Sequence, residues 1–540
     1  MSSEDFRLIK PVPLTSAVPF TRPSPKSVYD RTGTLIEVPA NTLGVTYDPV
    51  DLRKAPWALL EPAATNAVQN NTMQGAVVGT GTLPNYWNPA TNVPGLIRQV
   101  VGLGKEDGID YIDIRVYGTV GAIAIPEYTF QFTGGLYTAA GVGETWVSSL
   151  YARIVSGLDG NLTAFEHYIL AYQANGSLAE ARQALYPPTT GRLRENRLVH
   201  TLTISGAGAA FVANRIDLNF KNGGNYDIDV VLRIGLPQLE RDRISSPIRT
   251  SDGAVTRAAD VVGAGAGLVY SNVPITEPLW VAGTYAQGAR VRDAANFVFE
   301  SLADGNTSVL SEKTKWLPLG ITNRLKMFDK AVNSQTVWPE EVVVVVKAAQ
   351  LANALTLLNV TGASVSVSQS ESTYSRARSL VSHDVLSWYD FWYQEPLWIG
   401  DVVFDDLPPY IESVVTVAVR SPSNQAAVGG FFLGKSKFIG KTQWGLTAGI
   451  LSYSGATADT FGNVTLMKRD SAKKMNFEVA IPRGYEDEVY RYMRSAENVE
   501  MVAIASTNWS MTISYGYLGQ WELPLSIDGK KMPVEWRGLI

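Results

Sequence analysis

Between residues 66 and 262 the sequence repeats short runs in which apolar and polar residues alternate, and Gly, Asn, Asp and Pro separate the runs. In the run YIDIRV of residues 111–116, for example, every second residue is Ile or Val. Successive side chains of a β-strand point to opposite faces, so each run has one apolar and one polar face. We therefore predict an antiparallel jelly-roll sandwich, in which one side of each sheet packs inward. Residues 177–185 are the one short stretch of this segment that favours a helix.

The 540 residues exceed what one ordinary core holds, and at about 100–200 residues per domain we expect three or four units. Charged residues make up only 18% of the chain, whereas Gly, Thr, Ser, Asn, Trp and Tyr are plentiful. This composition favours strands and tight turns, so we expect a mainly β, multidomain protein. No period of about 20–50 residues repeats clearly, which disfavours propellers and solenoids.

The net charge is −5, and no run of Lys and Arg forms a basic stripe, so DNA and RNA are not expected as partners. The absence of cysteine excludes disulfides, thiolate catalysis and Cys-bound metal, and suits a chain that folds in a reducing cytosol. The N-terminal residues lack a basic region followed by an apolar one, and the longest apolar runs fall short of about 20 residues. We therefore expect no signal peptide and no membrane insertion.

Residues 1–65 contain many prolines and few periodic apolar positions, which disfavours helix and central strand. This segment predicts an extended, Pro-rich docking arm. Its apolar side chains, such as Phe6, Leu8, Ile9 and Trp57, would be exposed if the arm were free. We therefore expect the arm to lie along a neighbouring domain or another subunit, with an unstructured tail as the alternative.

Two segments follow residues 66–262. Residues 263–332 are rich in Gly and aromatic residues and predict a small module with a thin core. Residues 333–540 again contain alternating runs and predict a C-terminal β-rich assembly domain. One amphipathic helix is expected there after Pro482, because four apolar residues have the i, i+3, i+4, i+7 spacing of one helix face: Val489, Tyr492, Met493 and Ala496.

Several phrases of the sequence resemble tail-associated proteins of tailed bacteriophages. They are LLEPAATN at residues 59–66, GTGTLPNYW at 79–87, IDYIDIRVYGT at 109–119, PQLERDRISSPIRTSDGAVTRAADVV at 237–262 and WLPLGITNRLKMFD at 316–329. The sandwich resembles carbohydrate-binding modules of the family 4/9 jelly-roll type. The phrase WVAGTYAQGARV at 280–291 resembles a small chitin-binding type of module, in which a three-stranded β-sheet presents aromatic residues. It departs from that type at Ala289 and Arg290, where an acidic residue is common.

The resemblance implies a virion structural protein of the tail tip, baseplate or fibre apparatus, made in the cytoplasm of the host bacterium. Its expected partners are other virion proteins and bacterial surface glycans. We expect a homo-oligomer, with a trimer as a guess, because several copies turn weak sugar binding into firm attachment. Two alternatives stay open. One is a purely structural head or tail decoration or fibre protein without sugar binding, and the other is a polysaccharide depolymerase, which the lack of β-helical repeats disfavours.

Glycan-binding modules use flat aromatic side chains that stack on the apolar face of a sugar ring. Our candidates for this role are Trp87, Trp280, Tyr285, Phe299 and Trp316. Trp87 lies in a turn rich in Pro and Asn and is expected to be exposed, whereas at least two of the other four are expected to form the core of the small module. Four aromatic residues in or beside strands of the sandwich are expected mainly to pack: Trp146, Tyr151, Tyr168 and Tyr172.

The densest aromatic cluster is WYDFWYQEPLW at residues 388–398. Amphipathic rings bury large areas while losing few rotamers, so we predict a subunit interface. The candidates are Trp388, Tyr389, Trp392, Tyr393 and Trp398. An ordinary core and a glycan site are the two alternatives.

The sequence shows no catalytic or cofactor signature. His167, His200 and His383 are the only histidines, and neither HExxH nor GxSxG occurs. Asp405 and Asp406 could supply two carboxylates, but adjacent side chains on a strand point to opposite faces, so the sequence favours a solvated turn over a catalytic pair. Loop Asp or Asn side chains could hold a structural calcium ion, but no EF-hand pattern indicates one. We therefore expect no enzyme and no cofactor.

Overall fold

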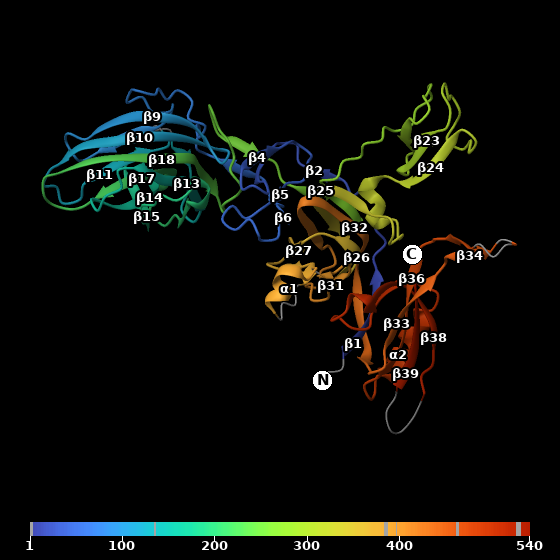
Figure 1. Cartoon of the computed structure of the whole chain (residues 1–540). Helices are drawn as coiled ribbons and strands as arrows, with labels where there is room; N and C mark the ends of the chain where they lie inside the picture. Colours follow the sequence, from blue (N-terminus) through green and yellow to red (C-terminus); the bar gives the residue numbers. More distant parts are fainter. Residues whose placement is uncertain are drawn as a thin grey trace. The chain divides into compact units, whose positions relative to one another are not determined.

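The computed structural model describes residues 4–133, 137–382, 387–395, 397–458, 460, 464–524 and 531–539. Their regular structure is mostly β-strand, which confirms the predicted mainly β class (Figure 1). The chain divides into two compact units. The sandwich unit comprises Phe20–Lys54 and Leu59–Val262, and the C-terminal unit comprises Met1–Pro19, Ala55–Ala58 and Gly263–Ile540. The four domain segments expected from the sequence stay a prediction.

Two antiparallel sheets form the layers of the sandwich unit (Figure 1). The five-stranded sheet has the order β16 (Arg197–Thr203), β13 (Thr145–Ser156), β18 (Tyr226–Arg241), β10 (Ile109–Val120) and β9 (Ile97–Glu106). The six-stranded sheet has the order β15 (Leu178–Tyr186), β14 (Leu162–Gln173), β17 (Ala209–Phe220), β11 (Glu127–Gln131) and β8 (Asn88–Thr91), and β12 (Thr138–Ala139) also pairs with β17. Shorter elements are β2 (Phe20–Thr21), β3 (Lys26–Tyr29), β4 (Leu35–Val38), β5 (Val45–Thr46), β7 (Ala64–Asn66), β19 (Val255–Arg257), β20 (Val261–Val262) and the 3₁₀ turn η1 (Leu193–Glu195).

One hydrophobic core lies between the two sheets. The alternate residues Ile112, Ile114 and Val116 of β10 are fully buried in it, as the sequence pattern predicts. The expectation of a helix at residues 177–185 is wrong, because this stretch forms the edge strand β15, hydrogen-bonded to β14. Its Ala, Leu, Glu and Arg residues have high helix propensity, and pairing with the sheet overrides that preference.

A buried ionic cluster joins the first and last segments of the sandwich unit. Lys26 Nζ lies 2.9 Å from Glu61 and 2.5 Å from Asp260, and Arg22 lies 3.0 Å from Asp260. Arg257 lies 2.8 Å from Glu61. Burial lowers the pKa of Lys26, against the opposing effect of both carboxylates. Removing one partner of a buried ion pair leaves an uncompensated charge, so this cluster fixes where the chain enters and leaves the sandwich.

The C-terminal unit is built on a thirteen-stranded sheet. Its main path is β21 (Gly267–Ser271), β25 (Thr336–Lys347), β32 (Val414–Thr442), β1 (Glu4–Pro11), β37 (Met501–Ile504), β38 (Ile513–Trp521), β39 (Lys531–Gly538), β36 (Ser471–Ala480) and β33 (Thr447–Ser452). Off this path lie β26 (Ala354–Thr361), β27 (Ser364–Gln369), β28 (Ser375–Ser379) and β31 (Val402–Phe404). The N-terminal strand β1 is hydrogen-bonded on both sides, to β32 and to β37, so the expectation that residues 1–65 form no central strand is wrong for Glu4–Pro11. The first proline of the chain is Pro11, at the end of β1, so no proline interrupts this pairing.

The expected amphipathic helix is α2 (Glu486–Ser495). Val489, Met493 and Ala496 are buried in a core cluster with residues of β36, which confirms the predicted packing on a sheet.

The small module has the expected three-stranded sheet, formed by β22 (Arg290–Arg292), β23 (Phe297–Ser301) and β24 (Trp316–Ile321). The remaining elements are β6 (Trp57–Ala58), β29 (Val381–Ser382), α1 (Trp388–Tyr393), β30 (Leu397–Trp398), β34 (Gly455–Ala458), β35 (Val464–Met467) and the 3₁₀ turns η2 (Asn323–Phe328) and η3 (Ser510–Thr512). In the described part of the chain, no helix is long and apolar enough to cross a bilayer.

Candidate functional site

Trp87 does not lie where the sequence suggested. Its side chain is only 7% exposed, and it packs edge-on against Phe132 with ring centroids 4.8 Å apart. Its indole nitrogen donates a hydrogen bond of 2.8 Å to the Asn70 carbonyl oxygen. The expected exposure of Trp87 is therefore wrong, because the turn folds the ring back into the core, and no ring face is open for sugar stacking. Trp146 and Tyr151 are buried, as expected.

In the small module the four aromatic candidates divide into core and partly exposed residues. Trp316 is fully buried, packs edge-on against Tyr285 at 5.3 Å, and donates from its indole nitrogen to the Ser308 carbonyl oxygen at 2.9 Å. Trp280 and Phe299 are half-buried, and Phe299 borders a hollow of about 350 Å³. A role of these four residues in sugar binding stays a prediction.

The aromatic cluster of residues 388–398 is strongly exposed. Trp388, at the start of α1, is 81% exposed, and Tyr389, Trp392, Tyr393 and Trp398 are each at least 60% exposed. An ordinary core is therefore wrong for these rings, while the predicted subunit interface stays a prediction. The neighbouring residues 383–386, which include His383, lie outside the described residues.

The outer face of the six-stranded sheet brings together polar side chains that the sequence does not place side by side. The even-numbered residues 212, 216, 218 and 220 of β17 belong to the core, so the odd-numbered Arg215, Asp217 and Asn219 point away from it. The strand register sets Tyr168 of β14 opposite Arg215, and Glu166 of β14 opposite Asp217. On its other side, β17 pairs with β11. There Gln131 lies opposite Arg215, Thr129 opposite Asp217, and Glu127 opposite Asn219.

We call this surface the polar sheet face and define it by Glu127, Glu166, Tyr168, Arg215, Asp217 and Asn219. Most of its groups are held by one another. Tyr168 donates from its hydroxyl to Glu166 at 2.8 Å, and Asn219 donates to the other oxygen of Glu166 at 2.5 Å. The Arg215 guanidinium lies 2.9 Å from the Asp217 carboxylate and 4.4 Å from the centre of the Tyr168 ring. Such mutual contacts fix the side chains before a ligand arrives.

Burial changes the protonation of these groups. It raises the pKa of Asp217 to about 7, and the nearby Arg215 opposes this change. Burial, followed by the charge of Glu166, also raises the pKa of Glu127. Burial raises the pKa of Tyr168, and the Glu166 carboxylate adds to it. Each shift has the direction expected for an acid moved out of water, so Asp217 is desolvated and Glu127 and Tyr168 are partly desolvated.

A hollow of about 650 Å³ opens over the polar sheet face, next to Glu127, Glu166, Tyr168 and Asn219. Its size is within the range of sites for small ligands. Farther along β14, Tyr172 lies opposite Phe211 of β17 and stacks on Tyr137, with ring centroids 4.3 Å apart and planes 16° apart. The outer sheet face therefore offers hydrogen-bonding groups at one end and aromatic rings at the other.

Among the described residues, no three His, Asp or Glu side chains gather to hold a metal ion. Asp405 and Asp406 contact different cations, because Asp405 lies 3.7 Å from Arg7 and Asp406 lies 3.2 Å from Arg376. His167 is buried between the sheets, where its Nε2 shares a 2.7 Å hydrogen bond with the Ser148 hydroxyl. Desolvation lowers the pKa of His167 to about 3, so it is a neutral core group at physiological pH.

Sequence reasoning treated Tyr168 and Tyr172 as packing residues and did not select Glu166, Arg215, Asp217 or Asn219. A signal was present in the strand RIDLNF at residues 215–220, where Arg, Asp and Asn occupy every second position. This alternation places all three polar side chains on one face of the strand. That pattern alone does not say which strand lies next to them.

No family model and no curated protein matches the sequence. Solved structures match at low similarity. The arabinose-bound α-L-arabinofuranosidase MgGH51 matches with 10% identity and a TM-score of 0.24, over 34% of this chain and 27% of that chain. The enzymatically active domain of Bacteriophage CBA120 tailspike protein 4 matches with 10% identity and a TM-score of 0.20, over 33% of this chain and 21% of that chain.

The CBM22-1 xylan-binding domain from Paenibacillus barcinonensis Xyn10C matches with 13% identity and a TM-score of 0.21, over 35% of this chain and 100% of that chain. This chain thus spans less than a third of the length of the first two proteins. At TM-scores this low, the likenesses give no argument about the function of this chain, which has to come from the geometry of the polar sheet face.

Proposed function

We propose that this chain binds a glycan on the polar sheet face of its sandwich unit and that it is a component of a bacteriophage virion. The observation that carries the glycan part is the hollow beside Glu166, Tyr168 and Asn219, whose hydrogen-bonding groups are fixed and lie on the sheet face that points away from the core. Sugar hydroxyls need such donors and acceptors, and the rings of Tyr137, Tyr172 and Phe211 supply apolar surface for stacking.

The virion part of the proposal is supported by the phage-like phrases at residues 59–66 and 237–262. In this role the chain belongs to the tail tip, baseplate or fibre apparatus and attaches the particle to glycans of the bacterial surface. Several copies act together, so that weak individual sites give firm attachment. The exposed rings at residues 388–398 are assigned to contacts with other virion subunits.

The polar sheet face is proposed as a binding site without hydrolysis. A glycosidase needs one carboxyl that delivers a proton and a second that acts on the sugar ring or on a water molecule. Asp217, the acid with the strongly raised pKa, is fully buried against Arg215, and both oxygens of Glu166 already accept hydrogen bonds. These carboxyls therefore hold neighbouring side chains in place.

The direct test is binding of the whole chain to an array of capsular and lipopolysaccharide fragments, followed by titration with the strongest ligand. Asn219→Ala and Tyr172→Ala are each expected to weaken binding at least tenfold. Tyr117→Ala is the matched control, because Tyr117 lies on the outer face of the five-stranded sheet. Equal affinity of all three variants would overturn the glycan proposal, and release of reducing sugar by the purified chain would overturn the absence of hydrolysis. The chain's absence from purified particles would overturn the virion part.

A further inference from the structure

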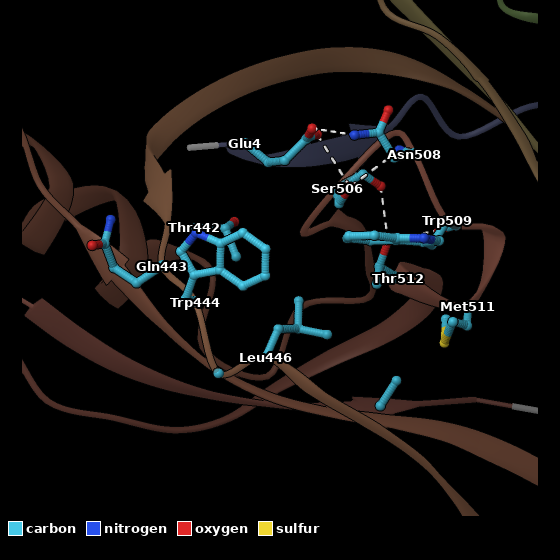
Figure 2. Close-up of a pocket in the computed structure, with 12 residues that line it drawn as sticks. Glu4, Thr442, Gln443, Trp444, Leu446, Ser506, Asn508, Trp509, Met511 and Thr512 are labelled. Carbon is cyan, nitrogen blue, oxygen red and sulfur yellow. Dashed lines mark hydrogen bonds between the residues drawn. The ribbon is translucent and has the colours of Figure 1, made fainter. Parts of the chain in front are cut away.

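A second hollow lies within the C-terminal unit, distant in sequence from the sandwich strands. It has a volume of about 600 Å³, and two tryptophans line it, Trp444 and Trp509. Trp444 is 77% exposed and Trp509 is 51% exposed. Figure 2 shows their rings on two sides of the hollow, with Leu446 between them and Glu4 along one edge. We call it the tryptophan hollow.

The backbone that carries Trp444 is fixed by the end of the central sheet. Thr442, two residues earlier, is the last residue of β32 and pairs with Glu4 of β1 and with Val479 of β36. The Gln443 amide nitrogen donates to the Glu478 carbonyl oxygen at 2.8 Å. The exposed Trp444 ring therefore follows directly from a strand that is hydrogen-bonded on both sides.

The opposite wall, which carries Trp509, is held by side-chain hydrogen bonds. The Thr512 hydroxyl donates to the carbonyl oxygens of Trp509 at 2.7 Å and Ser506 at 2.8 Å. The Glu4 carboxylate accepts from the Ser506 hydroxyl at 3.1 Å and from the side-chain amide of Asn508. The first described residue of β1 therefore ties the Trp509 loop to the sheet (Figure 2). A ring held this way loses little conformational freedom when a ligand binds.

The chemistry of the lining indicates the class of ligand. The rings offer flat apolar faces, and the Asn508 amide and the Glu4 carboxylate lie along one edge of the hollow (Figure 2). Among the described residues that line the hollow, Glu4 is the one ionisable side chain. A sugar ring has an apolar face for stacking and hydroxyls for amide groups, whereas an anionic ligand would meet Glu4 without a compensating cation.

We propose that the tryptophan hollow is a second glycan site, which takes an uncharged sugar ring between Trp444 and Trp509. It is separate from the polar sheet face, and its existence does not depend on the function proposed for that face. Two different sites on one chain would let it engage two positions of the bacterial surface, and the copies in an oligomer would multiply this effect.

The test uses the full chain and neutral oligosaccharides, with cellohexaose, xylohexaose and the uncharged fragments of the array as probes. Trp444→Ala and Trp509→Ala are each expected to weaken binding of the best neutral probe at least tenfold. Trp388→Ala is the matched control, because Trp388 is at least as exposed as the two tryptophans of the hollow but lies on α1. Trp509→Tyr keeps an aromatic face and is expected to restore most of the affinity. The chain with Tyr172→Ala should still bind the neutral probe, which separates this site from the polar sheet face.

Three results would overturn the proposal. One is the absence of binding to any neutral probe by the Tyr172→Ala chain. Another is a preference for uronate-containing or phosphorylated fragments over neutral ones that depends on Trp444. The third is self-association of the chain, measured by sedimentation, that is lost in the Trp509→Ala variant. In that case a second copy of the chain would cover the rings. Folding of each variant is checked by hydrogen exchange of β32 and β37, so a loss of binding cannot come from unfolding.

Discussion

The outer faces of the two sandwich sheets carry the same three kinds of side chain in different surroundings. On the five-stranded sheet, Arg115 pairs with Asp229 and lies 4.5 Å from the Tyr117 ring centre, and the two charged side chains are 38% and 56% exposed. On the six-stranded sheet, Arg215 pairs with Asp217 and lies 4.4 Å from the Tyr168 ring centre, but the Asp217 carboxylate is fully buried.

The two triplets differ in the solvent exposure of their aspartate side chains. Arg115 lowers the pKa of Asp229 by hydrogen bonding, whereas burial raises the pKa of Asp217. Keeping a charged pair out of water costs free energy that an exposed pair does not. A sheet face that points away from the core needs no such desolvation for folding. The binding function proposed above would account for the burial of the Asp217 carboxylate.

The largest expected difference between the two triplets is the effect of removing the arginine. At pH 8, Arg215→Ala removes the cation beside the Asp217 carboxylate, and an acid with a pKa of about 7 then takes up a proton at a cost of about 1.4 kcal/mol per pH unit. With the lost contact of Arg215 to the Tyr168 ring, we expect a loss of about 2–3 kcal/mol from the sandwich unit. Arg115→Ala removes one partner of an exposed, solvent-screened pair and should change stability little. Hydrogen exchange of β14 and β17 measures the first variant, and exchange of β10 and β18 measures the second. Equal losses would remove the distinction between the two faces.

A smaller effect is expected from the two tyrosine hydroxyls. Tyr168→Phe removes the donor of a 2.8 Å hydrogen bond to the Glu166 carboxylate, and hydrogen bonds to charged groups contribute about 1.5–3 kcal/mol. Tyr117→Phe, among partly exposed groups, should stay within about 0.5 kcal/mol. The same exchange measurement compares them. A Tyr168→Phe variant as stable as the parent would show that Glu166 is solvated.

Two buried groups, Asp217 and His167, change the stability of the sandwich unit with pH in opposite directions. Asp217 has a raised pKa of about 7 in place of 3.8, so the stability it contributes below pH 3.8 is lost as pH rises towards 7. His167 has a lowered pKa of about 3 in place of 6.5, so stability is lost as pH falls from 6.5 towards 3. Each slope reaches at most about 1.4 kcal/mol per pH unit. Between pH 4 and 6.5 the two largely cancel.

Two variants separate these slopes. Asp217→Asn should leave the His167 effect, so that the stability of the sandwich unit rises with pH between 4 and 6.5. His167→Gln should leave the Asp217 effect, so that stability falls with pH over the same interval. Thermal unfolding of each variant at several pH values checks both directions. Parallel pH profiles of the two variants would contradict the assignment of either group.

The sequence predicted the parts of this molecule that depend on local pattern. Alternation identified the buried face of β10, and apolar spacing identified the face of α2 that carries Val489 and Met493. Trp87 was predicted to be exposed because Pro and Asn surround it, yet its ring contacts Phe132, which lies far from it in the sequence. Turn composition describes the backbone and does not show where a large side chain packs.

The polar sheet face could not be predicted for a related reason. Alternation shows that Arg215, Asp217 and Asn219 share one face of β17, but the neighbour of β17 is set by the topology of the sheet. Only the pairing of β14 with β17 places Tyr168 against Arg215. The same residue types on β10 and β18 remain partly exposed, so residue type alone does not show which face is desolvated.

The smallest expected effect concerns salt. The exposed pair of Arg115 and Asp229 is screened by ions, so its small contribution should disappear between about 0.05 and 0.5 M NaCl. The buried pair of Arg215 and Asp217 is reached by few ions, so its coupling should change little over the same range. Double-mutant cycles at both salt concentrations measure the two coupling energies. If both couplings fell to the same extent, the Asp217 carboxylate would be as accessible to solvent as Asp229, and the desolvation that distinguishes the two sheet faces would be absent.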